Sequence, residues 1–344
     1  MPETFHAVHW RDLELLLAAH GVLQEDSGGF YAQVWGKDKL ESLSRTYPLL
    51  FEVTRSLTPR YSLWGLEPLL LYPMERFSLA DYAAFLDEQA PEELIRAALA
   101  LDFCPEWDSG RIALARSDDA VAQALLAQMD REREIPFLAF RTFLHQVKDL
   151  AAQLMALARD LDDGDFAGTL DRYGSQLRQE LRTMERDLET APPLEYSERR
   201  MGKTFRNRGP YEEYWFVPVV FLHYRACRLA RPGEFARVQI LLLSQRTGEA
   251  GEKAAVRRLK AMADEGRFKI MTLLAQGEAL RGTDIAKRLK LAPSTVSHHM
   301  DQLRQAGLIH EETTREGKYY SLNKPGVQSL LETLEHRFGS AGDG

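Results

Sequence analysis

The stretch "DIAKRLKLAPSTVSHHMDQLRQAGLI", residues 284–309, decides the fold of the C-terminal part of this chain. It predicts a short helix over 284–290, a tight connection, and a second helix over 295–306. Ser294 is placed to cap the second helix, and Gly307 is expected to end it. Two helices joined by a turn of three residues indicate a helix-turn-helix.

The preceding residues predict two further helices. The first covers 253–263, and Asp264 is a natural N-cap for the second. The side chains of the second helix that we expect to face inward are Phe268, Ile270, Met271 and Leu274. In the short helix of the turn motif, Ile285 and Leu289 are expected to be buried.

The residues after Gly307 predict a strand in "LIHEET", a turn in "TREG" and a strand in "KYYSLN". A closing helix follows in "GVQSLLETLEHRF". A helix-turn-helix followed by a hairpin with a charged tip is typical of a winged-helix domain. We therefore assign residues 251–338 to a winged-helix DNA-binding domain and 339–344 to a flexible tail.

Two adjacent histidines in the second helix could form a metal site, a catalytic pair, a pH switch or part of a binding surface. At about 100° per residue, Val296, Met300 and Leu303 share one arc, and His299 lies at its edge. His298 lies on the outer arc with Ser294, Thr295 and Ser297. Short hydroxyl groups beside one longer polar ring suit a helix that approaches base edges in the major groove. For His299, a packing role is favoured.

The C-terminal part resembles the ArsR-type winged-helix repressors. The stretches that carry this resemblance are residues 284–309, quoted above, "MADEGRFKI" (262–270) and "REGKYYSL" (315–322). The resemblance covers a quarter of the chain. It implies that Thr295, Ser297 and His298 touch DNA. Lys290 stands where this family usually has a helix-ending glycine, and a left-handed lysine costs about 1 kcal/mol.

The predicted DNA interface combines base-reading and phosphate-binding residues. On the second helix it comprises Ser294, Thr295, Ser297, His298 and Gln302; the cations are Lys287, Lys290, Arg304, Arg315 and Lys318. For His298 the alternative is an exposed histidine without a role, and for the wing tip it is a solvated turn. The partner is expected to be double-stranded DNA with a palindromic operator.

A homodimer is expected, and its two-fold symmetry predicts a palindromic operator with half-sites about one helical turn apart. Its contacts are predicted from the helix over 253–262 and from the apolar side chains of the last helix. These are Leu330, Leu331, Leu334 and Phe338.

A metal sensor is not expected. ArsR-type thiolate sites require cysteines in the first helix of the turn motif, and "GTDIAKRLK" (282–290) has none. Glu332, Glu335 and His336 have the character of a solvated helix face. His6 and His9 are two ligands short of a zinc site. We expect no cofactor.

Residues 1–250 form the predicted N-terminal domain, which is mostly helical. One helix begins at Arg11 and is expected to end near Gly21, and Ser117 is a plausible N-cap further on. The long amphipathic stretch 137–160 carries Phe140, Leu144, Val147, Ala151, Leu154 and Leu157 on one stripe. The fold class is therefore mainly α with small β parts.

Residues 211–243 are the β-rich part of the N-terminal domain. β-Branched and aromatic residues fill two runs separated by "RPGE" (231–234), which predicts a β-hairpin. Pro218 is confined to an edge or a strand end. The basic run "RRMGKTFRNRG" (199–209) is interpreted as a charged loop, with a contact to an anion or to the DNA backbone left open.

Aromatic side chains concentrate in and around this β-rich part. They could line an effector pocket, but core packing is slightly favoured. The residues are Trp64, Tyr72, Trp107, Phe205, Tyr211, Tyr214, Trp215, Phe216, Phe221 and Tyr224.

Charge and composition limit the possible functions. The chain has a net charge of −7, but residues 253–344 carry 15 Lys/Arg against 11 Asp/Glu, so the acidic excess lies before them.

A cytoplasmic location is expected, because signal and membrane-spanning patterns are missing. In that compartment Cys104 and Cys227 are expected to be free, buried thiols. No catalytic motif is found, so we expect no enzyme. The sequence indicates a transcription regulator whose N-terminal domain senses a signal or mediates assembly. The resemblance implies that it is a repressor. The alternative is a metabolite-binding or enzymatic module with a regulatory winged helix.

Overall fold

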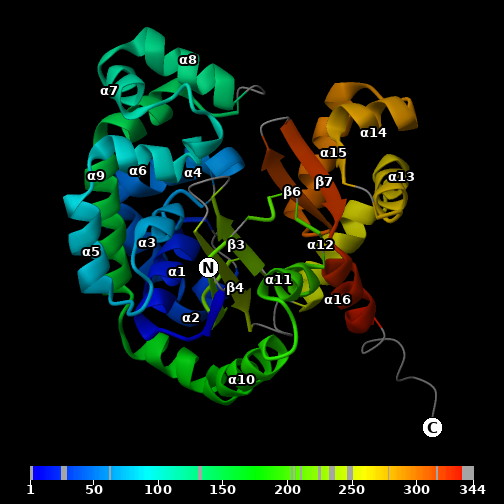
Figure 1. Ribbon diagram of the computed structural model, residues 1–344, viewed down its shortest axis with the longest axis horizontal. Helices are drawn as coiled ribbons and strands as arrows, with labels where there is room; N and C mark the ends of the chain where they lie inside the picture. The colour runs from blue at the N-terminus through cyan, green and yellow to red at the C-terminus, as the bar shows by residue number, and fades with distance from the viewer. Residues whose placement is uncertain are drawn as a thin grey trace. The chain divides into compact units, whose positions relative to one another are not determined.

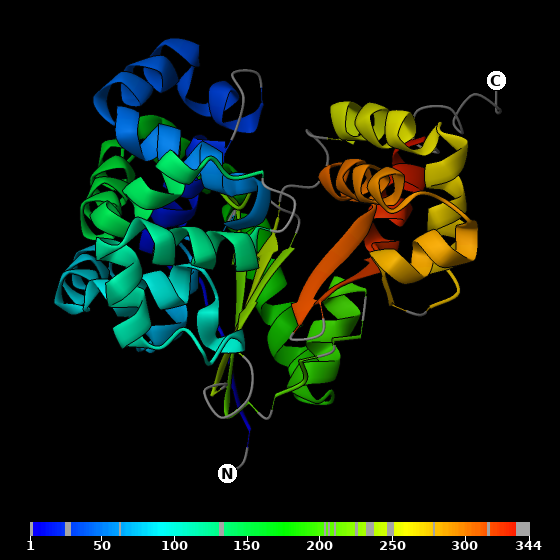
Figure 2. The ribbon, with the colours of Figure 1, turned by 90° about the horizontal axis from the view of Figure 1, so that it is seen from above.

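The computed structural model describes residues 3–24, 29–61, 63–130, 134–202, 204–205, 207–209, 211–223, 226–231, 237–245, 251–277, 279–314 and 317–334. The chain forms two compact units (Figures 1 and 2). Unit 1 comprises residues 1–189 and 209–245, and unit 2 comprises residues 190–208 and 246–344. The fold is mainly α with two small sheets, as predicted.

Unit 1 is built from helices around one sheet. Its α-helices are α1 (Arg11–Gln24), α2 (Phe30–Trp35), α3 (Lys37–Thr46), α4 (Pro48–Tyr61), α5 (Leu79–Glu88), α6 (Pro91–Ala98), α7 (Ser109–Ser117), α8 (Asp119–Met129), α9 (Phe137–Asp160) and α10 (Gly164–Leu188). Two 3-10 helices, η1 (Glu67–Leu71) and η2 (Leu101–Phe103), join them. Helix α9 packs against α1, α4, α5 and α8 (Figure 1), and every residue of its predicted apolar stripe is buried.

The sheet of unit 1 has the order β1-β2-β4-β3. Its strands are β1 (Thr4–Ala7), β2 (Glu213–Val219), β3 (Ala226–Ala230) and β4 (Val238–Ser244). β3 and β4 are antiparallel, which confirms the hairpin predicted across residues 231–234. β2 pairs in parallel with both β1 and β4, and neither β1 nor this parallel pairing was predicted. Pro218 lies beyond the last β1–β2 pair, where its missing N–H costs no ladder bond to β1.

A buried carboxylate ties α1 to the end of β2. Glu14 is fully buried, and its oxygens accept hydrogen bonds from the backbone N–H groups of Val220 (2.8 Å) and Phe221 (2.9 Å). His9 Nε2 lies 3.0 Å from Glu14 Oε1. A buried carboxylate is tolerated when hydrogen-bond donors surround it, so this cluster fixes α1 against the sheet.

Two predicted helix boundaries in unit 1 are wrong. Helix α1 continues through Gly21 to Gln24, because Gly21 serves packing: a Cβ there would lie 1.8 Å from the Tyr31 hydroxyl. Ser117 is the last residue of α7 and not the N-cap of α8. The cap is Asp118, whose carboxylate accepts from the backbone N–H groups at the start of α8.

The aromatic residues of unit 1 pack in its core. Trp215 and Phe221 belong to the main apolar cluster; Trp10 packs on Trp215 with its ring tilted, and Phe166 stacks on Phe221. Tyr224 lies outside the described residues. The other aromatic side chains considered for an effector pocket are also buried. Those of unit 1 are Trp64, Tyr72, Trp107, Tyr211, Tyr214 and Phe216, and Phe205 belongs to unit 2. Core packing therefore accounts for them.

Both cysteines are free thiols. Cys227 is buried, and burial raises the pKa of its thiol far above the ordinary value. Cys104 is only half-buried, so the predicted burial holds for Cys227 alone.

Unit 2 consists of α11 (Pro193–Met201), α12 (Gly251–Met262), α13 (Glu265–Leu274), α14 (Gly282–Leu289), α15 (Pro293–Gln305) and α16 (Lys324–Leu334). Its sheet has the order β5-β7-β6, from β5 (Leu280–Arg281), β6 (Ile309–Thr314) and β7 (Gly317–Leu322). Figure 2 shows the helices α12 to α15 gathered at one end of the β6–β7 hairpin. The predicted helices and the wing hairpin are present; β5 and α11 are additions.

The core of unit 2 is small and apolar. Ile270, Met271 and Leu274 of α13 are buried as predicted, and so is Ile285 of α14. Leu289 is half-buried. Phe268 is 55 % exposed, so its predicted inward orientation is wrong.

Segment 190–208 adds one helix to this winged-helix arrangement. Met201, the last residue of α11, offers its carbonyl oxygen to His310 Nε2 on β6 at 3.1 Å. The backbone N–H of Asn207 donates to Glu312 Oε1, also on β6, at 3.3 Å. The basic run is thus not a plain loop, since its first residues, 199–201, complete α11.

None of the helices in the described ranges combines the length and apolarity that crossing a bilayer requires.

Candidate nucleic-acid interface

Helix α15 (Pro293–Gln305) begins two residues earlier than predicted. Its N-cap is Ala292, whose side chain makes no capping bond, and Pro293 occupies the first helical position. Proline suits that position because its fixed φ is helical and its missing N–H has no helical partner. The capping role predicted for Ser294 is therefore wrong, and its side chain is exposed on the first turn.

The end of α15 is fixed by the glycine that the sequence indicates. Gly307 has φ +68°. Its N–H donates to the Arg304 carbonyl at 2.9 Å, and the N–H of Leu308 donates to the Leu303 carbonyl at 2.9 Å. This pair of bonds is the Schellman motif. It turns the chain from α15 into β6.

The two faces of α15 differ as the helical wheel predicts. Val296, Met300 and Leu303 are 1 %, 1 % and 0 % exposed and belong to the core of unit 2. Thr295 and His298 are exposed, and Ser297 is half-buried. The buried residues hold the helix in place, and Thr295 and His298 are exposed on the opposite face.

A chain of hydrogen bonds orients His298. The guanidinium of Arg267 on α13 donates to the Gln302 side-chain oxygen, and the Gln302 amide nitrogen lies 2.9 Å from His298 Nε2. Arg267 also donates to the carbonyl oxygens of Lys260 and Ala261 at the end of α12. Sequence reasoning missed Arg267, although its place in the first turn after the Asp264 cap was visible. Arg267 thereby links α12, α13 and the polar face of α15.

His299 is a packing residue, as predicted, although its Nδ1 is buried without a hydrogen-bond partner among the described residues. Its side chain is 13 % exposed, and its Nε2 lies 3.8 Å from Asp264 Oδ1. A Cβ at Gly266 would come within 2.7 Å of the same nitrogen, so the α13 turn needs a glycine there. Asp264 caps α13 by accepting from the Arg267 N–H. That hydrogen bond holds the pKa of the Asp264 carboxyl below its ordinary value, with the charges of Arg267 and His299 adding to it.

Lys287 and Lys290 are exposed cations on and after α14. Lys290 adopts φ +55° and ψ +40°, which confirms the left-handed conformation expected at the end of this helix. In the described part of the chain neither lysine has a carboxylate partner, so both ammonium groups are available to phosphates.

The cations near the wing are partly neutralised. Lys318 Nζ lies 2.9 Å from Glu311 Oε1 on β6. Arg304 lies 3.8 Å from Glu311 Oε2 and 3.6 Å from Asp301. Any phosphate that Arg304 or Lys318 contacts must therefore compete with Glu311. Arg315, the other predicted wing cation, lies outside the described residues.

The predicted dimerisation residues occupy different environments. Leu330 is 2 % exposed and serves the interior of unit 2, whereas Leu331 is 48 % exposed and Leu334 is half-buried. Phe338 lies outside the described residues. Val256 and Leu259 on α12 are 45 % and 42 % exposed, and α12 packs against α16. These exposed apolar side chains were not singled out from the sequence.

Among the described residues no three His, Cys, Asp or Glu side chains are grouped to hold a metal ion. His6 stacks on Trp215 with ring centroids 4.0 Å apart. Glu335 and His336 lie outside the described residues.

Two helices joined by a turn, a wing, and an exposed polar face on the second helix define a winged-helix DNA-binding domain. The profile of the family described as "Bacterial regulatory protein, arsR family" matches residues 264–311. The chain therefore belongs to the ArsR family and is a DNA-binding transcription regulator of that type. The matched residues all lie in unit 2.

Named relatives match about a quarter of this chain but most of their own length. The transcriptional activator HlyU of Vibrio cholerae is 32% identical over 93 residues, which are 27% of this chain and 85% of that protein. The transcriptional repressor SdpR of Bacillus subtilis is 38% identical over 75 residues, 22% of this chain and 82% of that protein. The arsenical resistance operon repressor of Bacillus subtilis is 35% identical over 88 residues, 25% of this chain and 84% of that protein. The structure of reduced HlyU from Vibrio cholerae covers 26% of this chain and 94% of its own, with 31% identity and a TM-score of 0.22.

Replacing Lys290 with glycine should stabilise the protein by about 0.5–1 kcal/mol, because glycine adopts the left-handed conformation without a steric cost. Urea denaturation followed by circular dichroism measures the change. Lys290→Ala is the matched control, since alanine keeps the strain and should bring no gain. Equal stability of the glycine and alanine variants would show that the conformation of Lys290 costs nothing.

Proposed function

We propose that the protein is a homodimeric repressor that reads a palindromic operator with α15. The observation that carries this proposal is the division of α15: its apolar face is fixed in the core of unit 2, and Thr295 and His298 stand exposed on the other face. A major groove admits one α-helix whose polar side chains meet base edges. Lys287 and Lys290 are exposed beside it and would bind backbone phosphates.

The proposed reading of bases predicts a loss of sequence discrimination when Ser297 and His298 are both replaced by alanine. Operator fragments are first selected from genomic DNA with the purified full chain. Gel shift at fixed salt should then show the double variant weakened on the operator by about 1–3 kcal/mol for each lost base contact, and little changed on scrambled DNA.

The control for this experiment is Thr272→Ala combined with His145→Ala, which removes one hydroxyl and one exposed imidazole elsewhere. It should bind the operator as the wild type does. Unchanged operator affinity in the Ser297 and His298 double variant would refute the assignment of α15 as the reading helix.

Dimerisation is proposed from the apolar side chains that unit 2 leaves exposed. Val256 and Leu259 lie one turn apart on α12, and Leu331 lies on α16, which packs against α12. Exposed apolar side chains on adjacent helices favour association with a second copy of the same surface, as two-fold symmetry requires. The two-fold axis of such a dimer would match a palindromic operator.

Replacing Leu259 and Leu331 with glutamate should therefore give a monomer that binds the operator more weakly, because each copy would place charges in the interface. Sedimentation equilibrium measures the mass, and fluorescence anisotropy measures the affinity. Leu114→Glu with Leu138→Glu is the matched control, since both leucines are exposed in unit 1. A dimeric glutamate variant, or a monomeric wild type, would contradict the proposal.

We further propose that unit 1 senses a signal and has no catalytic role. Segment 190–208 supports this, because it follows the N-terminal region in the chain and is hydrogen-bonded to β6. His310 and Glu312 of β6 hold Met201 and Asn207 of the segment by hydrogen bonds. A ligand that changes the conformation of the segment would therefore alter the hydrogen bonds that the segment makes to β6 of the wing.

A thermal-shift screen of metabolites with the full chain should identify a stabilising ligand. That ligand should change operator affinity by about 5–150-fold, and His310→Ala should reduce the change because it removes one link between the segment and β6. His145→Ala is the control. A ligand that binds without any effect on operator affinity would contradict the sensing role, and product formed from the ligand would favour the enzymatic alternative.

A further inference from the structure

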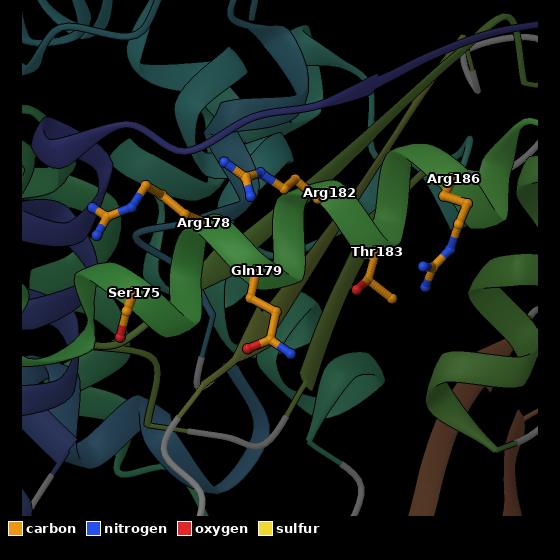
Figure 3. A pocket seen from close by; sticks show the side chains of 6 residues that line it. All are labelled: Ser175, Arg178, Gln179, Arg182, Thr183 and Arg186. Carbon is orange, nitrogen blue, oxygen red and sulfur yellow. The ribbon is translucent and has the colours of Figure 1, made fainter.

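Helix α10 carries a basic stripe along its outer face. We define the stripe as Arg178, Arg182 and Arg186, which follow one another at intervals of four residues and are all exposed. Figure 3 shows them beside a second row of neutral polar side chains, and the six together line a hollow of about 500 Å³. The neutral residues are Ser175, Gln179 and Thr183.

Little of the positive charge of the stripe is neutralised by the residues that the structure describes. Arg178 and Arg182 have no carboxylate partner in the described part of the chain, and Arg186 has only Asp187, 3.9 Å away. None of the six lining residues is acidic. Three cations at helical neighbour spacing repel one another. The region before residue 253 has an acidic excess, so this patch differs in sign from its surroundings.

The shape and chemistry of the hollow favour an extended anion over a small effector. Small-molecule sites bury most of the ligand between largely apolar walls. Here every lining residue comes from one helix, all six side chains are polar, and the arginines are exposed. None of these lining residues has an aliphatic or aromatic side chain that would hold a ring or an acyl chain.

The spacing of the stripe fits a row of phosphates. Four helical residues rise about 6 Å, so the three arginines span about 12 Å along α10. Each strand of DNA carries a phosphate about every 3.4 Å along the helix axis, so several phosphates fall within that length. The hydroxyl and amide groups of the second row are also donors that proteins use toward phosphate oxygens.

We propose that the basic stripe of α10 binds the phosphate backbone of double-stranded DNA, in addition to the α15 interface. This inference rests on the proposed DNA-binding function of the chain. Contacts with phosphates carry no sequence information, so the stripe adds affinity to operator and non-operator DNA alike.

The test measures the salt dependence of DNA binding by the full chain, using fluorescence anisotropy on operator and scrambled duplexes. Each lost phosphate contact lowers the slope of log K against log salt by about 0.9. The variant R178Q/R182Q/R186Q should therefore lose about 2–3 in slope on both duplexes. Each single variant should lose about 0.9. The lysine variant R178K/R182K/R186K keeps the charges and should retain most of the wild-type slope.

The matched control is R45Q/R141Q/R159Q, which removes three exposed arginines elsewhere in unit 1 and should leave the slope unchanged. An equal fall in slope for the control and stripe variants would attribute the effect to net charge and overturn the proposal. Equal slopes for the wild type and all stripe variants would overturn it as well, while the α15 assignment would stand. A wild type that binds no DNA would refute both.

A second experiment measures the melting temperature with inorganic tripolyphosphate as the probe. If it raises the melting temperature of the wild type but not of R178Q/R182Q/R186Q, and the DNA slopes of the two proteins are equal, the stripe binds a small phosphate compound and the DNA proposal fails. No stabilisation by tripolyphosphate together with the expected loss of slope supports the backbone assignment.

Discussion

The guanidinium of Arg267 is the point on which the geometry of the candidate DNA interface depends. It donates to the last carbonyl oxygens of α12 and to the side chain of Gln302, and Gln302 in turn contacts His298. A single planar group with several donors can hold three helices at once, which a lysine ammonium at the same position would do with less directional control. The orientation of His298 thus follows from packing and hydrogen bonding behind the surface.

Local sequence patterns predicted the parts of unit 2 that depend on near neighbours. The period of 3.6 residues separates Val296, Met300 and Leu303 from His298, and Gly307 ends α15 because only a residue without Cβ adopts its conformation freely. Ser294 was misassigned because Pro293 also starts helices well, and two adjacent start signals compete. Phe268 was misassigned because the helical period gives the direction of the apolar face of α13 but not how many side chains of that face are buried.

Contacts between distant segments could not be predicted in the same way. The strand β1 is four residues long and pairs with residues about 200 positions away, so its own sequence contains little of the information that fixes it. The contact between His310 and Met201 likewise joins residues 109 positions apart. At the candidate interface, the sequence predicted which face of α15 is exposed. It did not predict that Glu311 forms ion pairs with Arg304 and Lys318.

The order of segments along the chain distinguishes this protein from a winged helix simply fused to a second domain. The chain contributes 190–208 to unit 2, supplies 209–245 to unit 1, and then returns to unit 2 at 246. Unit 2 is therefore joined to unit 1 at three points in the sequence, and one of the joined segments is hydrogen-bonded to the wing strand β6. A single flexible linker would transmit little, because its conformational freedom absorbs a displacement. A segment joined to unit 1 at both ends and hydrogen-bonded to β6 has less of that freedom, and this is the physical basis on which we propose that a change in unit 1 reaches the wing.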